Sequence, residues 1–296
     1  MKRILLSAGL VLASFGLFFC PQHLSAKELT ILAAFGTSDS EAQKSLNAIK
    51  SAYEKQGDEV IWAYSSNIIR AKLNKEKQVV YSITEALDYA QKNGYKDLKI
   101  QSLHVVPAEE YMKICRLISR YMEVNGKNFD SAVMGHPLLS SYADLEQTIN
   151  AVFSAFPKER TAKDAVILMG HGNDRGTGDL SLIAAAGAFH KADPKVWLAT
   201  VEGALAFDNV LAELKKTDAQ KVWLMPFMIV AGDHAKNDMA GDEEDSWKTV
   251  LTQNGFEVHT VLEGLGSLAG IQEIFMEHTK LSHDNVKDNT IISHKK

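Results

Sequence analysis

The amino-acid sequence predicts an α/β protein of two similar domains, each a four-stranded parallel sheet flanked by helices, with a cleft between the domains. Three observations carry this prediction. Short apolar runs alternate with longer amphipathic segments, most runs are apolar at consecutive positions, and the runs fall into two groups of four. Alternating strands and helices are typical of parallel sheets covered by helices. Continuously apolar strands are expected where both faces of a sheet are buried.

The first four strands are expected at Leu29–Phe35, Glu59–Tyr64, Leu98–Val106 and Ser131–Met134. Apolar residues at helical spacing predict helices between them, at Ser40–Gln56 and Glu109–Val124. A further helix, Tyr142–Phe156, ends before Pro157 and links the two halves of the chain. We therefore assign residues 27–157 to an N-terminal α/β domain.

The second four strands are expected at Ala165–Met169, Val196–Thr200, Val222–Val230 and Glu257–Leu262. Helical spacing recurs between them, at Ala204–Lys216 and Glu243–Asn254. Residues 158–264 thus form a C-terminal α/β domain. The remaining residues, 265–296, are expected to contain an amphipathic helix, Gly266–Leu281, that packs back on the N-terminal domain.

Residues 1–26 have the layout of a secretory signal peptide. Lys2 and Arg3 provide a positive start, Ile4–Phe19 is an uncharged apolar run, and Ala26 offers a cleavage site. The run is short for a membrane span, and no later stretch is apolar enough to cross a bilayer. We therefore expect an exported, periplasmic protein with no membrane span in its mature form.

The net charge and the cysteines narrow the functional classes. The 296-residue chain has a net charge of −5, and loss of Lys2 and Arg3 with the leader makes it −7. Such a protein is a poor general binder of nucleic acid, which is not expected as a partner. Cys20 would leave with the leader, and Cys115 alone cannot form an intrachain disulfide. No Cys-x-x-Cys-His sequence is present for covalent haem attachment, whereas noncovalent haem stays open.

Three polar side chains follow the first three strands of the second predicted sheet, namely His171, Glu202 and His234. Carboxyl ends of parallel strands meet at one edge, where ligands bind in such sheets. A single histidine after a strand is usually a polar loop residue, but three residues at equivalent positions favour a site. Two imidazoles and a carboxylate suit Co, Ni, Fe or Zn and leave coordination positions open. Glycines flank these residues at Gly170, Gly172, Gly203 and Gly232.

Four segments are similar to one known family: Leu103–Tyr111, Val166–Gly172, Thr200–Gly203 and Met225–Trp247. They resemble the anaerobic (class II) sirohydrochlorin cobaltochelatases, which insert cobalt into sirohydrochlorin on the way to cobalamin. The resemblance runs from Leu29 to His278, and some members are exported. It implies an ATP-independent chelatase that inserts Co(II) during cobalamin or sirohaem-type tetrapyrrole synthesis, with Fe(II) and Ni(II) as alternative metals. No nucleotide is implied, and the chain has no Gly-x-x-x-x-Gly-Lys-[Ser/Thr] loop.

The resemblance also implies roles for single residues. It carries the family's metal ligands onto His171, Glu202 and His234, and we expect His171 to act as a base as well. Glu110 corresponds to a catalytic glutamate on the opposite side of the cleft. Polar and cationic side chains at the cleft edge are expected to contact the carboxylates of the macrocycle. The candidate substrate-binding residues are Arg175, Lys236 and His104, with solvated or structural roles as the alternative.

One departure from the family keeps a second function open. The family usually continues after Gly-His-Gly with a second histidine and an Ala-Asn pair, whereas this chain reads Asn173–Gly178 with a different sequence. The altered loop favours an exported haem-, tetrapyrrole- or metal-binding carrier, or a haem-demetallating protein, on the same fold. Retention of Glu202 and both histidines favours an enzyme. The sequence leaves homo-oligomerisation open.

Overall fold

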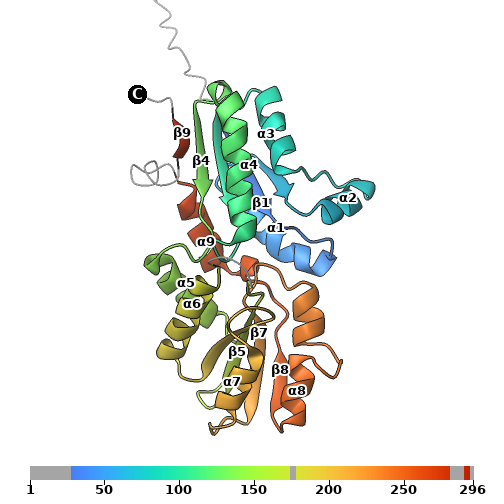
Figure 1. Cartoon of the computed structure of the whole chain (residues 1–296), viewed down its shortest axis with the longest axis vertical. Helices are drawn as coiled ribbons and strands as arrows, with labels where there is room; N and C mark the ends of the chain where they lie inside the picture. The colour runs from blue at the N-terminus through green and yellow to red at the C-terminus, as the bar shows by residue number, and fades with distance from the viewer. Residues whose placement is uncertain (1–27, 174–177, 281–289, 294–296) are drawn as a thin grey trace, which may run out of the picture.

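The structure, a computed structural model of the whole chain, describes residues 28–173, 178–280 and 290–293. Two α/β domains lie end to end along the long axis of the molecule (Figure 1). Each contains a parallel sheet with covering helices, so the predicted fold class is confirmed. The predicted signal peptide lies outside the described residues.

The N-terminal sheet contains β1 (Glu28–Ala34), β2 (Val60–Tyr64), β3 (Asp97–Ser102) and β4 (Ser131–Gly135). They pair in parallel in the order β2-β1-β3-β4. A fifth strand, β9 (Thr290–Ser293), pairs antiparallel with β4 and extends the four predicted parallel strands at one edge. A strand of four residues is too short to show a hydrophobic pattern of its own. Its partner, β4, lies far away in the sequence, so the pairing could not be predicted locally.

The C-terminal sheet contains β5 (Ala165–Gly170), β6 (Val196–Thr200), β7 (Lys221–Pro226) and β8 (Glu257–Thr260), in the order β6-β5-β7-β8. The predicted third strand, Val222–Val230, is too long. β7 ends at Pro226, which has no N–H to continue the ladder. The apolar residues that follow, from Phe227 onward, leave the sheet and enter the cleft between the domains.

The helices are α1 (Ser40–Lys55), α2 (Asn67–Lys75), α3 (Ile83–Lys92), α4 (Glu109–Asn125), α5 (Tyr142–Ser154), α6 (Gly178–Ala192), α7 (Phe207–Leu214), α8 (Trp247–Gln253) and α9 (Ala269–His278). The predicted helix Glu243–Asn254 begins only at Trp247, because the Ser246 side chain caps its first turn by accepting from the Thr249 backbone N–H. No helix in the described ranges is long and apolar enough to cross a membrane.

Side-chain alternation along the central strands buries both faces of each sheet. On β1, Ile31 and Ala33 face a cluster with α3 and α4, whereas Leu32 and Ala34 face a cluster with α1. The cluster that contains Leu32, Ala34 and α1 continues into the C-terminal domain. It includes Leu46 and Ile49 of α1, Ile271 and Phe275 of α9, and Leu168, Met225 and Phe227 of the C-terminal domain.

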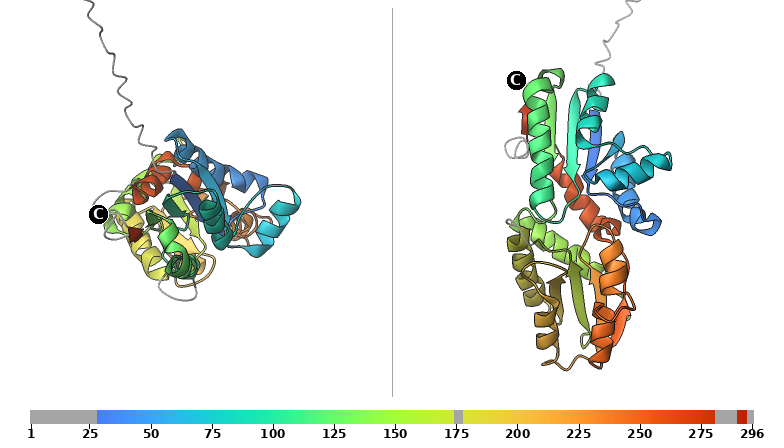
Figure 2. Two further views of the ribbon diagram at one scale, coloured as in Figure 1. Left: turned by 90° about the horizontal axis from the view of Figure 1, so that it is seen from above. Right: turned by 45° about the vertical axis from the view of Figure 1, so that its right-hand side comes forward.

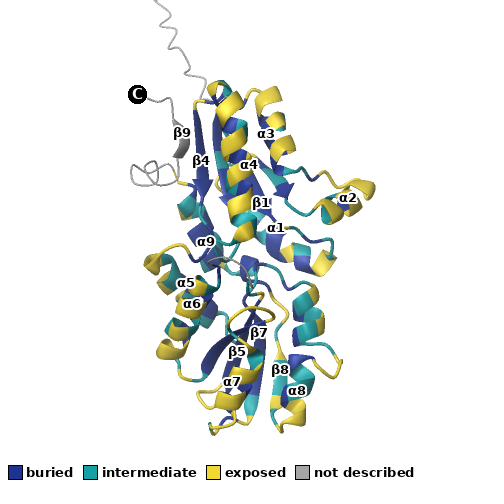
Figure 3. Ribbon diagram, in the orientation of Figure 1, coloured by how far each residue is buried: buried dark blue, intermediate teal, exposed yellow. Residues whose placement is uncertain are grey.

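Helix α9 lies at the joint between the domains, where its inner face is buried (Figures 2 and 3). It packs beside α5, and the Tyr53 hydroxyl of α1 donates a 2.8 Å hydrogen bond to the Phe275 carbonyl. Burial of this shared apolar surface holds the two domains together.

Candidate metal site in the cleft between the domains

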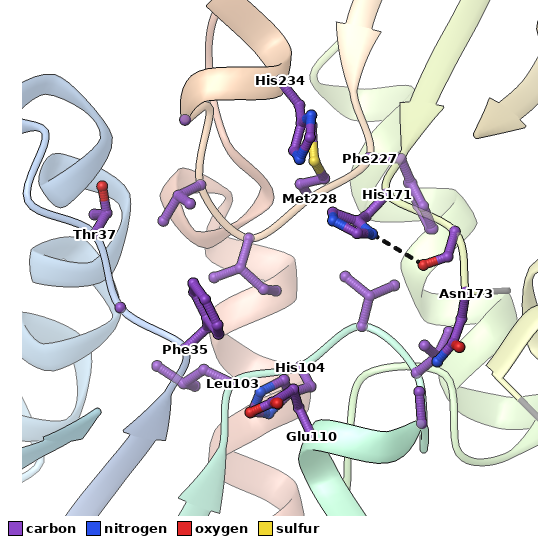
Figure 4. Close-up of a pocket in the computed structure, with 18 of the residues that line it drawn as sticks. Phe35, Thr37, Leu103, His104, Glu110, His171, Asn173, Phe227, Met228 and His234 are labelled. Atoms are coloured by element: carbon purple, nitrogen blue, oxygen red, sulfur yellow. Dashed lines mark hydrogen bonds between the residues drawn. The ribbon is translucent and has the colours of Figure 1, made fainter. Parts of the chain in front are cut away.

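A cavity of about 850 Å³ opens between the domains, at the carboxyl ends of both sheets (Figure 4). Segments that follow β1, β3, β5 and β7 line it. This volume lies within the range of roughly 300–1,000 Å³ typical of small-ligand sites. The wall is largely apolar, and Phe35 is unusual for an aromatic residue because 53% of its surface is exposed.

His171 and Glu202 are neighbours at the C-terminal wall of this cavity. Nδ1 of His171 lies 3.3 Å from Oε1 of Glu202, and both side chains are about half exposed. Their loops are joined by the backbone, since the Glu202 N–H donates to the His171 carbonyl at 3.0 Å. The parallel pairing of β5 with β6 thus continues beyond the strands and sets the distance between these two side chains.

Gly172 makes this close approach of the two loops possible. Its φ angle is +84°, which L-residues with a side chain rarely adopt. A Cβ atom at this position would lie only 1.8 Å from the carbonyl oxygen of Glu202. The glycine predicted to allow close backbone approach is therefore needed for the two loops to touch each other.

Asp179, which sequence reasoning did not select, ties the same two loops to the start of α6. Its Oδ1 atom accepts from the Asn173 N–H at 2.8 Å, and its Oδ2 atom accepts from the Ala204 N–H at 2.7 Å. An aspartate in the first turn of a helix is common, so its position in the sequence carried no specific signal.

His234 lies in the segment that follows β7, just before a π-helical turn, Ala235–Met239. Its ring centre lies 4.9 Å from that of His171, with the rings nearly perpendicular. Its Nδ1 atom is 2.5 Å from Oδ2 of Asp238. A carboxylate in this position accepts from Nδ1–H, which leaves Nε2 as the atom for a metal. The i, i+4 spacing of His234 and Asp238 was a sequence signal that the prediction missed.

The ring separation agrees with two imidazoles that share one metal. Metal–nitrogen bonds of about 2.1 Å place two such ring centres roughly 4.5–5.2 Å apart. The nitrogen and oxygen atoms of the three side chains nevertheless do not point at one common position. The described part of the chain contains no group of three His, Cys, Asp or Glu side chains arranged to hold a metal ion. His171, Glu202 and His234 are thus close neighbours whose side chains must rotate to share a metal.

Glu110 and His104 lie on the N-terminal wall, opposite His171 and His234 (Figure 4). Glu110 accepts a 2.8 Å hydrogen bond from the Ser65 hydroxyl. Nδ1 of His104 is 2.8 Å from the Ser102 hydroxyl, and its buried Nε2 atom has no hydrogen-bond partner among the described residues. Desolvation lowers the pKa of His104 to about 4, although the charge of Glu110 opposes this shift. His104 is therefore neutral at neutral pH.

The predicted substrate-binding cations are placed differently. Arg175 lies outside the described residues. Lys236 is not part of the described cavity wall, and its Nζ atom donates to Oδ2 of Asp39 across the two domains at 2.6 Å. This hydrogen bond holds the pKa of the Asp39 carboxyl below its ordinary value. The metal-binding, catalytic and substrate-binding roles of these residues stay predictions.

Two parallel-sheet domains with histidines and a carboxylate facing a glutamate across a cleft are the arrangement that the sequence resemblance implies for a chelatase. Sequence comparison identifies the family within this class. Residues 28–283 match the cobalt chelatase (CbiK) family, and the chain belongs to this family.

Two curated relatives cover most of the chain. A protein of Nitratidesulfovibrio vulgaris named sirohydrochlorin cobaltochelatase CbiKC is 32% identical over 260 residues, which are 87% of this chain and 91% of that one. A sirohydrochlorin cobaltochelatase of Salmonella typhimurium is 31% identical over 259 residues, with 85% of this chain and 95% of that one covered.

Solved structures show the same fold. The sirohydrochlorin chelatase SirB of Bacillus subtilis subspecies spizizenii, in complex with cobalt, aligns with a TM-score of 0.58 and 13% identity over 88% of this chain and 97% of that one. SirB of Bacillus subtilis with Fe3+ aligns with a TM-score of 0.60 and 14% identity over 85% and 94%. At such identities the likeness concerns the fold alone.

Proposed function

We propose that this protein is a sirohydrochlorin cobaltochelatase, which inserts Co(II) into the macrocycle without ATP, in cobalamin or sirohaem-type synthesis. The observation that carries the proposal is the meeting of His171, Glu202 and His234 at one wall of a cleft, with Glu110 on the other. The names of the relatives that match over most of the chain support the substrate and the metal.

The metal, which is a substrate here, is taken up first by the C-terminal wall. Side-chain rotation brings Nε2 of His234, the His171 imidazole and the Glu202 carboxylate onto Co(II), and the carboxylate offsets part of the charge of the dication. Three protein ligands leave positions for the pyrrole nitrogens. Asp238 orients the His234 ring while the metal is bound, because its carboxylate accepts a hydrogen bond from Nδ1 of His234.

Insertion replaces two pyrrole N–H protons by one Co(II), so two protons must leave the macrocycle. Glu110 faces the metal wall and accepts one proton. His171 accepts the second after it has passed the metal to the macrocycle, since its imidazole nitrogen is then free again. The reaction thus conserves charge and needs neither an oxidant nor ATP.

The apolar part of the cleft provides the surface for a flat ring. Phe35 extends into the cavity beside Leu103, with Phe227 and Met228 nearer the histidines (Figure 4). An aromatic side chain that is half exposed inside a cavity gains free energy when a flat ligand covers it. This wall orients the macrocycle between the metal ligands and Glu110.

The test is an insertion assay with purified protein that begins at Lys27. Sirohydrochlorin is mixed with Co(II), Fe(II) or Ni(II), without ATP, and the change in absorbance is followed. We expect acceleration with Co(II), and loss of turnover in the His234→Ala variant. A rate equal to that of metal and macrocycle alone would refute the enzyme. Tight tetrapyrrole binding without turnover, or a haem spectrum in the purified protein, would instead support the carrier.

Export to the periplasm is part of the same proposal, and the sequence of residues 1–26 supports it. It is tested by fractionating cells that express the full chain. We expect the mature protein in the periplasmic fraction, with Lys27 as its first residue. An intact N-terminus in the cytoplasmic fraction would contradict export.

A further inference from the structure

The charge of the cavity wall poses a problem for an acidic macrocycle. Its described lining includes five carboxylates and neither lysine nor arginine, the acidic residues being Asp39, Glu109, Glu110, Glu202 and Asp233. A negative wall favours entry of a metal dication but opposes a tetrapyrrole that carries several carboxylates. A cationic side chain beside this lining would offset that repulsion.

Lys236 occupies such a position. It lies on the π-helical turn that follows His234, and its Nζ atom is 2.6 Å from Oδ2 of Asp39, which itself lines the cavity. The ammonium and the carboxylate are both partly exposed, at 34% and 41% of their side-chain surface. An ion pair this exposed contributes little net free energy, because water screens it. Another carboxylate can therefore replace Asp39 at low cost.

We propose that Lys236 is a substrate-binding residue that exchanges Asp39 for a carboxylate of the tetrapyrrole. This inference rests on the proposed function, since it requires an acidic macrocycle in the cleft. The exchange keeps the number of ion pairs the same, because the ammonium is paired with one carboxylate before and after, and the partly exposed Asp39 carboxylate turns to water. In the free protein Asp39 competes with the substrate, and in the complex Lys236 anchors the macrocycle beside the turn that carries the metal ligand His234.

The two partners of the pair then have opposite effects on substrate affinity. Lys236→Met removes the anchor and leaves the Asp39 carboxylate uncompensated beside the substrate, and we expect the Kd for sirohydrochlorin to rise about fivefold, the upper end for an exposed ion pair. Asp39→Asn removes the competitor, and the Kd should fall roughly two- to fivefold. Asparagine keeps the cap of α1, because Oδ1 still accepts from the Ala42 N–H, at 2.9 Å in the wild type.

The experiment measures binding of metal-free sirohydrochlorin by quenching of the intrinsic tryptophan fluorescence, for which the chain has four tryptophans. Lys44→Met is the matched control, since Lys44 forms an exposed ion pair with Glu41 on α1 at 2.5 Å. Its Kd should equal that of the wild type. Thermal midpoints are recorded for all variants, so that misfolded protein is recognised.

A rise in Kd for Lys236→Met together with a fall for Asp39→Asn supports the exchange. If both variants raise the Kd, or if Lys236→Met leaves it unchanged, the pair is a structural bridge between domains and the proposal is wrong. The readout needs no turnover, so it is independent of the insertion assay. Failure of wild-type protein to accelerate insertion would overturn the proposed function, whereas failure of the opposite shifts would overturn only the exchange.

Discussion

Gly172→Ala is the substitution that tests most directly how the loops that carry His171 and Glu202 are held together. Alanine at φ +84° costs about 1–2 kcal/mol from the backbone conformation alone. The new Cβ would also lie 1.8 Å from the Glu202 carbonyl oxygen, so that oxygen must retreat by at least 1.2 Å to reach the 3.0 Å limit of real contacts. Overpacking of this kind costs roughly 1–3 kcal/mol more.

The same retreat moves Glu202 away from His171. A displacement of about 1 Å in a catalytic arrangement lowers turnover roughly 100-fold. We therefore expect Gly172→Ala to lose about 2–5 kcal/mol of unfolding free energy and to lower kcat/KM for cobalt insertion roughly 100-fold. Urea unfolding and the absorbance assay measure the two quantities.

Gly255→Ala separates the cost of the backbone conformation from the cost of the steric overlap. Gly255 lies in the same domain, in the turn between α8 and β8, with φ +90° and no atom within 4 Å of an added Cβ. It should lose only the conformational part, about 1–2 kcal/mol, with cobalt insertion unchanged. Equal losses of stability in both variants, with activity retained in Gly172→Ala, would show that the loops adapt and that our reasoning is wrong.

Two further outcomes are expected. Asp238→Ala should weaken Co(II) binding about 10- to 100-fold in a titration of the metal's visible absorption, because His234 loses the carboxylate that orients it; unchanged affinity would contradict that role. His104→Gln should flatten the dependence of stability on pH. The folded-state pKa of His104 is about 4, below its ordinary value, so the unfolded chain takes up the proton first and the wild type loses stability as pH falls from about 6.5 to 4. Equal slopes of urea midpoint against pH in both proteins would refute this assignment.

Local pattern was enough to predict the fold class and the edge of the sheet at which His171, Glu202 and His234 lie. Consecutive apolar positions mark strands buried on both faces, and β5 and β6 end one and two residues before His171 and Glu202. β7 ends at Pro226, eight residues before His234, so the segment between them is a loop that follows the strand. Strand lengths were less predictable. The apolar residues after Pro226 read as a continued strand, although they line the cleft and join the apolar cluster that runs through both domains.

The sequence by itself determined two α/β domains, the edge of the second sheet that carries the candidate metal ligands, and, through family resemblance, the glutamate that faces them. Only the tertiary structure decided which side chains form the hydrogen bonds and ion pairs around these residues. Asp39 and Lys236 are 197 positions apart, and Asp179 reaches Ala204 across 25 positions. Periodicity reports which residues of one element are buried, whereas such pairs depend on how separate elements pack, and packing leaves no repeat in the chain.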